Sequence, residues 1–126
     1  MSSIIRRFDL LQVGQMSSVK RCYQPNELAE WQSLSGWQGP LVTLPEPLIA
    51  ALFSYLLGVR LPGAGTMYLK QSMVFEYLVR PDEPVQASVM ITQLRPGKSL
   101  VNLDTVCTDA AGRTICQGKA LVLFKC

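Results

Sequence analysis

Residues 45–65, PEPLIAALFSYLLGVRLPGAG, constrain the fold more than any other stretch of the chain. Two prolines bracket Glu46; proline is tolerated in the first turn of a helix, where a glutamate also complements the positive end of the dipole. The residues that follow are apolar apart from one serine and one tyrosine, and Gly58 supplies the left-handed residue that often ends a helix. A helix that is apolar nearly all round is a buried helix. About twelve residues cannot cross a bilayer, which takes roughly 20, so the sequence predicts a core helix over residues 46–57.

The chain before this helix carries the signals of one strand and one short helix. Residues 17–23, SSVKRCY, are predicted to form the strand. Asn26 is placed to cap a helix with acidic residues in its first turn, and Gly36 marks its end. Apolar residues recur at every third position of this helix and predict one packed face, made of Leu28, Trp31 and Leu34.

After Thr66 the apolar and polar residues alternate as they do in half-buried strands. Strands are predicted over residues 67–79, 85–92, 100–107 and 114–124, with turn-forming residues between them. In the first strand Gln71 interrupts an otherwise apolar face, which comprises Met67, Leu69, Met73, Phe75, Tyr77 and Val79. In the third strand the predicted core face comprises Val101, Leu103, Thr105 and Cys107.

Long strands joined by tight turns predict an antiparallel meander, and the one apolar helix precedes it. A sheet that curls round a single helix is the hotdog architecture, so the fold class is α+β and residues 1–126 form one domain. Such strands leave an edge that must be paired or covered. Pairing with a second chain would do so and would also explain why only 17% of residues are charged, against the usual 25% or so.

The composition excludes several classes of protein. The chain contains no histidine, which removes histidine-based acid–base catalysis and nucleophile systems. None of the four cysteines forms a C-x-x-C pair, so we do not expect a metal site. We expect no cofactor either. The net charge of +3 comes from scattered cations, which gives no sign of a nucleic-acid partner. The N-terminus lacks the apolar run of a signal peptide, so a cytoplasmic protein with free thiols and no membrane partner is expected.

Four short motifs follow one another in the middle of the chain. They are L-F-S-x-L-L-G at 52–58, L-P-G-x-G-T-x-Y-L at 61–69, Q-S-x-x-F at 71–75, and an acidic turn at 82–85. Together they closely resemble the MaoC-like hydratases, which include the (R)-specific enoyl-CoA hydratases and related hydroxyacyl dehydratases. The final strands and the early LQVGQ segment at 11–15 fit the same family, so the resemblance covers nearly the whole chain and implies the hotdog fold.

The resemblance also implies an acid–base pair that this sequence lacks. The family carries an Asp and a His in a segment like D-x-N-P-x-H between its first helix and the hotdog helix, and together they activate the water that adds to the enoyl double bond. In this chain Trp37 stands where the Asp is expected, and Gly39 with Pro40 where the Asn-Pro is expected. The His-Gly pair that usually begins the hotdog helix is replaced by Pro45 and Glu46.

Two residues are candidates for catalysis. Glu46 stands at a helix start, where hotdog thioesterases often carry a catalytic carboxylate; the alternative is that it only complements the helix dipole. Ser54 is the one residue that matches a polar active-site position of the family, and the alternative is a hydrogen bond to a carbonyl one turn earlier. Trp37 is interpreted as filling the vacated active site. The candidate substrate-binding residues are Trp37, Gly39, Gly63 and Gly65.

Hydration needs a base and an acid at hydrogen-bond range of the substrate, and Trp37 can serve as neither. The resemblance therefore favours a MaoC-like homologue that binds an acyl thioester, on coenzyme A or acyl-carrier protein, without normal hydratase catalysis. It would act as a binding or partner subunit in a homodimer, or in a heterodimer with another hotdog subunit. The alternative is an active enzyme, a thioesterase or dehydratase that uses Glu46 in fatty-acid or polyketide-type metabolism. A scaffold without any ligand is the third possibility.

Overall fold

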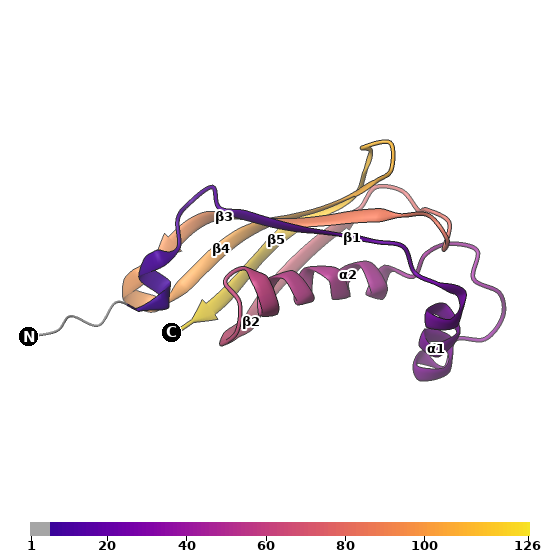
Figure 1. Ribbon diagram of the computed structural model, residues 1–126, viewed down its shortest axis with the longest axis horizontal. Coiled ribbons are helices and arrows are strands. Elements are labelled where there is room, and N and C mark those ends of the chain that lie inside the picture. Colours follow the sequence, from indigo (N-terminus) through magenta and orange to yellow (C-terminus); the bar gives the residue numbers. More distant parts are fainter. Residues whose placement is uncertain (1–5) are drawn as a thin grey trace, which may run out of the picture.

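The computed structural model describes residues 6–126, in which a five-stranded antiparallel sheet covers one long helix (Figure 1). This is the predicted α+β hotdog fold. No helix within residues 6–126 combines the length and the apolar character needed to cross a membrane. The elements in chain order are η1 (Arg7–Leu10), β1 (Met16–Arg21), α1 (Pro25–Ser35), α2 (Glu46–Tyr55), η2 (Leu56–Arg60), β2 (Thr66–Phe75), β3 (Val85–Arg95), η3 (Pro96–Lys98), β4 (Leu100–Asp109) and β5 (Thr114–Phe124).

The strand order is β1-β3-β4-β5-β2, which only partly agrees with the predicted meander. Strands β3, β4 and β5 are neighbours in sequence and in space, but β2 pairs with β5 and not with β3. The predicted turn at 80–84 is present, since the backbone N–H of Glu83 donates to the carbonyl of Arg80 over 3.1 Å, but it does not join neighbouring strands. Residues 76–84 instead carry the chain from one edge of the sheet towards the other. As a result β1 and β2 are the two edge strands, each with a pairing partner on one side only within the described part of the chain.

One face of α2 supplies the centre of the core. Ile49, Leu52 and Phe53 are buried there, as are Leu56 and Leu57 in the following turn. They pack in one cluster with the inward side chains of the sheet, and burying each large side chain is worth about 1.5–3 kcal/mol. The sequence predicted a helix buried nearly all round, but the opposite face of α2 is exposed. Its exposed residues include Ala51, Ser54 and Tyr55.

The helix also ends differently from the prediction. Gly58 is not in the left-handed conformation, and the chain winds on as a π-helical turn, η2, to Arg60. The backbone N–H of Leu61 donates to the carbonyl of Leu56 over 2.7 Å, which is the wider hydrogen bond of such a turn. The left-handed glycines come later, at Gly63 and Gly65, where the chain turns into β2.

A bulge at Leu69 changes which residues of β2 face the core. The register with β5 shifts between Tyr68 and Lys70, so the predicted shared face is wrong for Met67 and Leu69, which are both exposed. Beyond the bulge Met73 and Phe75 pack against the core as predicted, but Gln71 faces inward with them. Its amide donates to the hydroxyl of buried Thr105 over 3.3 Å, which explains how the core accepts two polar groups.

The short helix α1 also departs from two expectations. Its N-cap is Gln24 and not Asn26, because the backbone N–H of Gln24 donates to the side chain of Glu27 over 2.8 Å in a capping box. Gly36 ends the helix in the left-handed conformation, as predicted. The predicted packed face does not hold at Leu34, which is 89% exposed, because α1 projects beyond the end of the sheet (Figure 1).

The last three strands agree closely with the alternation in the sequence. The predicted core face of β4 is confirmed, since Val101, Leu103, Thr105 and Cys107 are all buried. Val85, Ala87, Val89 and Ile91 are buried on β3 in the same way. Cys107 lies opposite Cys116 on β5, and both are free thiols, as the sequence analysis expected.

The hairpin between β4 and β5 is held by Asp109, whose carboxylate is nearly buried. The hydrogen bond from the Tyr77 hydroxyl lowers the pKa of Asp109 to about 2, and donors from Arg113 and Ala111 add to this while burial opposes it. A carboxylate with a lowered folded-state pKa contributes stability above its ordinary pKa near 4. That contribution is therefore complete at neutral pH and is lost as the pH falls from about 4 to 2.

We expect Asp109→Asn to lower the melting temperature by several degrees at pH 7, because the donors that surround the nearly buried carboxylate lose their charged acceptor. The difference from the native protein should shrink as the pH falls below 4, and thermal unfolding followed by circular dichroism measures both. Asp82→Asn is the control, because its pair with Arg80 is exposed and should contribute little. A difference that stays constant down to pH 2 would contradict the assigned role of the carboxylate.

Candidate functional site

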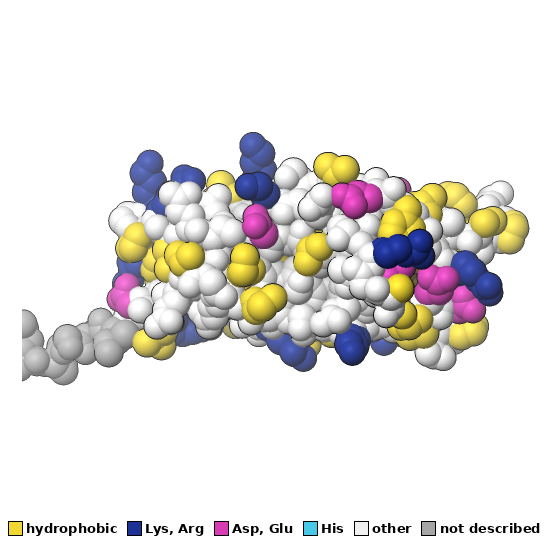
Figure 2. All heavy atoms as spheres, turned by 90° about the horizontal axis from the view of Figure 1, so that it is seen from above, with side chains coloured by type: hydrophobic (Ala, Val, Ile, Leu, Met, Phe, Trp, Pro, Cys, Tyr) yellow, Lys and Arg dark blue, Asp and Glu magenta, His cyan; other side chains and the backbone are white. Residues whose placement is uncertain are grey.

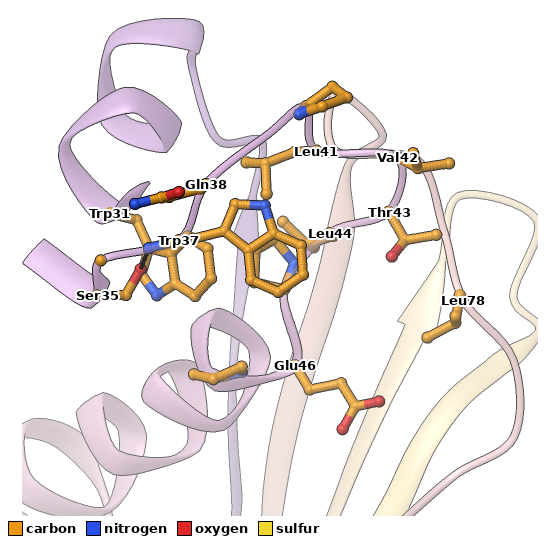
Figure 3. A pocket seen from close by; sticks show the side chains of 14 residues that line it. Trp31, Ser35, Trp37, Gln38, Leu41, Val42, Thr43, Leu44, Glu46 and Leu78 are labelled. Carbon is orange, nitrogen blue, oxygen red and sulfur yellow. Dashed lines mark hydrogen bonds between the residues drawn. The ribbon is translucent and has the colours of Figure 1, made fainter. Parts of the chain in front are cut away.

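A hollow of about 820 Å³ lies where the loop between α1 and α2 crosses the start of α2 (Figure 3). We call it the tryptophan hollow, because Trp31 and Trp37 form one of its walls. Leu44, Glu46 and Leu78 contribute from the end of the loop, the helix start and the segment after β2. Its size is in the range of small-molecule sites, and its lining is mainly apolar with a few polar groups.

Local hydrogen bonds give the loop a defined path. The side-chain amide of Gln32 donates to the carbonyl of Gly39 over 2.9 Å, and the backbone N–H of Leu44 donates to the carbonyl of Val79 over 2.8 Å. Gly36 and Gly39 both have positive φ, so the loop can reverse direction twice within four residues. The first bond ties the loop to α1 and the second ties it to the sheet.

Trp37 lines the hollow and does not fill it. Its ring lies 6.1 Å from that of Trp31 at an angle of 42°, which is a favourable tilted contact. The side chain is 53% exposed, and its backbone N–H is held by the Ser35 hydroxyl over 3.2 Å. The two indoles therefore offer a fixed apolar wall beside open space, which suits an acyl chain better than a closed core.

Glu46 opens α2 at the edge of the hollow. Figure 3 shows its carboxylate extending away from the two indoles, towards the side where Leu78 lies. Burial, together with the negative charges of Glu46 and Glu76, raises the pKa of the Cys116 thiol to about 11. Within residues 6–126 the Glu46 carboxylate has no hydrogen-bond or ion-pair partner, so no side chain holds it in one orientation for proton transfer.

The other predicted site residues lie apart from this hollow. Gly39 belongs to the same loop, but Gly63 and Gly65 follow the far end of α2, about 20 Å away at 1.5 Å per helical residue. Gly65 has a φ of +97°, which other residues rarely adopt, and a side chain there would also meet the Cys126 sulfur at 2.4 Å, so the turn itself accounts for this glycine. One protomer therefore does not bring the predicted residues together in one site.

Ser54 lies between these two groups, on the exposed face of α2. The alternative in which its hydroxyl bonds back to a helical carbonyl is not found, since no hydrogen bond joins Ser54 to another of the described residues. The hydroxyl is thus available to a ligand or a second chain that covers this face.

Two parts of the hollow were missed by the sequence analysis. Leu78 was expected to continue a strand, but β2 ends at Phe75, and the side chain lines the hollow while 54% exposed. Thr43 was treated as part of a short connection and supplies a hydroxyl to the lining. Leu78 stands just before a proline-rich, acidic stretch, and such a stretch is a poor context for the end of a long strand. This position could have indicated that the strand ends before Leu78.

Comparison with known proteins gives consistent relatives, although no family model matches the chain. The (R)-specific enoyl-CoA hydratase of Aeromonas caviae is 33% identical over 126 residues, covering 89% of this chain and 94% of that protein. The enzyme of the same name from Rhodospirillum rubrum is 42% identical over 76 residues, which cover 60% of this chain but only about half (52%) of that relative. The solved structure of the A. caviae (R)-hydratase involved in PHA biosynthesis superposes with a TM-score of 0.85 at 32% identity, covering 90% of this chain and 97% of that one.

Proposed function

The chain belongs to the MaoC-like family of (R)-specific enoyl-CoA hydratases, and from this membership we propose that it binds acyl thioesters without carrying out normal hydration. The thioester would be on coenzyme A or an acyl-carrier protein, and its acyl chain would lie against the indoles of the tryptophan hollow. The protein would serve as a binding subunit or as the partner of a catalytic hotdog subunit.

The composition of the hollow carries this proposal. Adding water to an enoyl thioester takes a group that removes a proton from water and a group that protonates the α-carbon. The chain has no histidine, and the position where the family aspartate is expected holds Trp37. Glu46 is the one carboxylate in the lining, and no described neighbour orients it. Losing two positioned acid–base groups would typically slow the reaction by roughly 10²–10⁴-fold each.

The edge strand β2 supports a dimer. It presents the unpaired side of a ten-residue strand, with Met67, Leu69 and Val74 about half exposed or more. An edge of this length with exposed apolar side chains favours pairing with another strand. A second copy of this chain or another hotdog subunit would cover it, and the exposed face of α2 with Ser54 would then be available to the same interface.

The purified protein alone should show no hydration of crotonyl-CoA above the rate without protein, and it should bind crotonyl-CoA saturably. Loss of the ultraviolet absorbance of the conjugated enoyl thioester reports hydration, and isothermal titration reports binding. The double variant Trp31→Ala and Trp37→Ala should weaken binding, because it removes the apolar wall. Absence of any saturable binding would contradict the proposal and favour the third possibility, a scaffold without any ligand.

Turnover by the protein alone would favour the alternative in which Glu46 acts as a base. Glu46→Gln then separates the two roles of this residue, because it keeps the shape and removes the carboxylate. Abolished hydration or thioester hydrolysis would assign Glu46 to catalysis, and unchanged turnover would limit it to complementing the helix dipole. Glu30→Gln is the matched control, since Glu30 is exposed on α1 and is not part of the lining.

A further inference from the structure

The charged side chains of this protein are divided unevenly between its two ends. Four segments meet at the end that holds the C-terminus: the start of η1, the loop before β2, the connection between β3 and β4, and the end of β5. Arg6 donates to the Pro96 carbonyl over 3.3 Å and Arg7 to the Ala64 carbonyl over 3.0 Å. The backbone N–H of Phe124 donates to the Ser99 carbonyl over 2.8 Å. Among the described residues Asp9 is the one acid in these segments. We call this the basic end; its six cationic residues are Arg6, Arg7, Arg60, Arg95, Lys98 and Lys125.

The tryptophan hollow lies at the opposite end, where Figure 1 places α1 and the start of α2. Most of the acidic side chains visible in Figure 2 lie towards this end. Of the nine acidic residues of the chain, seven lie there: Glu27, Glu30, Glu46, Glu76, Asp82, Glu83 and Asp109. Most of the cations at this end are already neutralised, because Arg21, Arg80 and Arg113 are ion-paired to Glu27, Asp82 and Asp109. No lysine or arginine of residues 6–126 lines the hollow itself. Phosphates attached to a bound thioester would therefore meet repulsion there.

The edge strand β2 connects the two ends. It starts beside the basic end at Thr66 and runs to Phe75, near Cys116 and Glu46. A second copy that pairs with β2 about a two-fold axis runs antiparallel to it. The basic end of each protomer then lies beside the acidic end of the other, and this arrangement is favoured by charge complementarity.

We propose that in this dimer the partner's Arg60 and the partner's Arg7 complete the site by binding the phosphate of a phosphopantetheinyl thioester whose acyl group occupies the tryptophan hollow. This rests on the proposed binding function. The phosphate is common to coenzyme A and to acyl-carrier protein. The arrangement also unites across the interface the predicted site residues that one protomer keeps apart, with Trp37 and Glu46 from one chain and Gly63 and Gly65 from the other.

Arg60 and Arg7 are suited to this role by their positions on either side of the loop that leads into β2. The Arg60 guanidinium lies 5.6 Å from the centre of the Tyr55 ring, which holds it against the exposed face of α2 without an acidic partner. The Arg7 guanidinium donates to Ala64 and lies 3.5 Å from where a side chain at Gly63 would begin. Arginine binds phosphate in a fixed, bidentate geometry, which suits a guanidinium that has no acidic partner.

The first test compares three ligands: crotonyl-CoA, crotonyl-4′-phosphopantetheine and crotonyl-pantetheine, which lacks phosphate. Arg60→Glu should weaken binding of the two phosphorylated ligands by about tenfold or more and leave crotonyl-pantetheine unchanged, because only a charge-assisted contact is lost. Arg60→Gln should give a smaller loss in the same direction. Lys20→Glu makes the same charge change on β1 at the other end and should alter none of the three affinities.

The outcomes separate this proposal from the function on which it rests. If the native protein binds none of the ligands, the proposed function fails. If it binds all three equally well, that function stands and the phosphate site is overturned. If Arg60→Glu affects crotonyl-CoA alone, the contact is to the nucleotide part of coenzyme A and the assignment to the shared phosphate is wrong.

Mixed dimers test whether the arginine acts on its own subunit or on the partner. Leu78→Trp is designed to fill the hollow from an exposed position in its lining. When one chain carries Leu78→Trp and the other carries Arg60→Glu, one site per dimer should keep native affinity, because the open hollow faces a native Arg60. When one chain carries both substitutions, no native site should remain. The reverse pattern, or a native protein that is monomeric at the concentrations used, would overturn the proposal.

Discussion

Replacing Gly118 by alanine should detach β2 from the sheet. Gly118 lies on β5 opposite Met73, and a Cβ atom there would stand 1.8 Å from the backbone oxygen of Ser72. Backbone cannot move aside as the end of a flexible side chain can, so the substitution should cost about 3 kcal/mol or more, which places it among the severe single changes. The effect is purely steric, since Gly118 does not have a positive φ.

Amide hydrogen exchange would locate the damage. We expect residues 66–75 to lose protection in Gly118→Ala while β3 and β4 keep theirs, because those two strands pair with each other and not with β2. Gly97→Ala is the matched control, since Gly97 has no atom within 4 Å of the new methyl group and no positive φ. A Gly118→Ala protein with native stability would mean that β2 lies farther from β5 than the structure places it.

The fold could be predicted from the sequence to the extent that alternation and apolar content determine it. The inward residues of β3 and β4 follow strict alternation, and the strongly apolar segment before them can only be the helix that they cover. The bulge at Leu69 could not be predicted, because an inserted residue leaves no mark in the pattern and reverses the faces before it. The pairing of β2 with β5 depends on the close approach at Gly118, and the sequence shows only a glycine within a strand.

The candidate site was harder to predict because its parts are brought together by the path of a loop. The sequence identified Trp37 and Glu46 because they stand at positions where the family carries other residue types, and both line the same hollow in the structure. The helix predicted over residues 46–57 already placed Gly63 and Gly65 beyond the end opposite Glu46, and η2 adds to this separation. The uneven distribution of charge was also hidden, since the acidic residues are spread along the sequence and seven of the nine lie at one end only after folding.

Leu69→Glu should convert the dimer to monomers and remove thioester binding with it. The side chain is 49% exposed at the bulge in the unpaired edge of β2, and a two-fold axis would bring its two copies close together. Two glutamates facing each other across an interface are repulsive, and the apolar contact is also lost. At roughly 2 kcal/mol for each of the two copies, the dimer dissociation constant should rise by about a thousandfold.

Light scattering coupled to gel filtration would follow the mass, and titration with crotonyl-CoA would follow binding in the same samples. Leu34→Glu makes the same substitution on α1, where the side chain is 89% exposed and far from β2, so it should leave both mass and affinity unchanged. If Leu69→Glu is monomeric yet binds crotonyl-CoA as tightly as the native protein, each protomer must hold a complete site, and the cations that meet the phosphates must belong to the same chain as the tryptophan hollow. Loss of binding together with the dimer is the expected result, because one protomer has its apolar wall at its acidic end and its free arginines at the other.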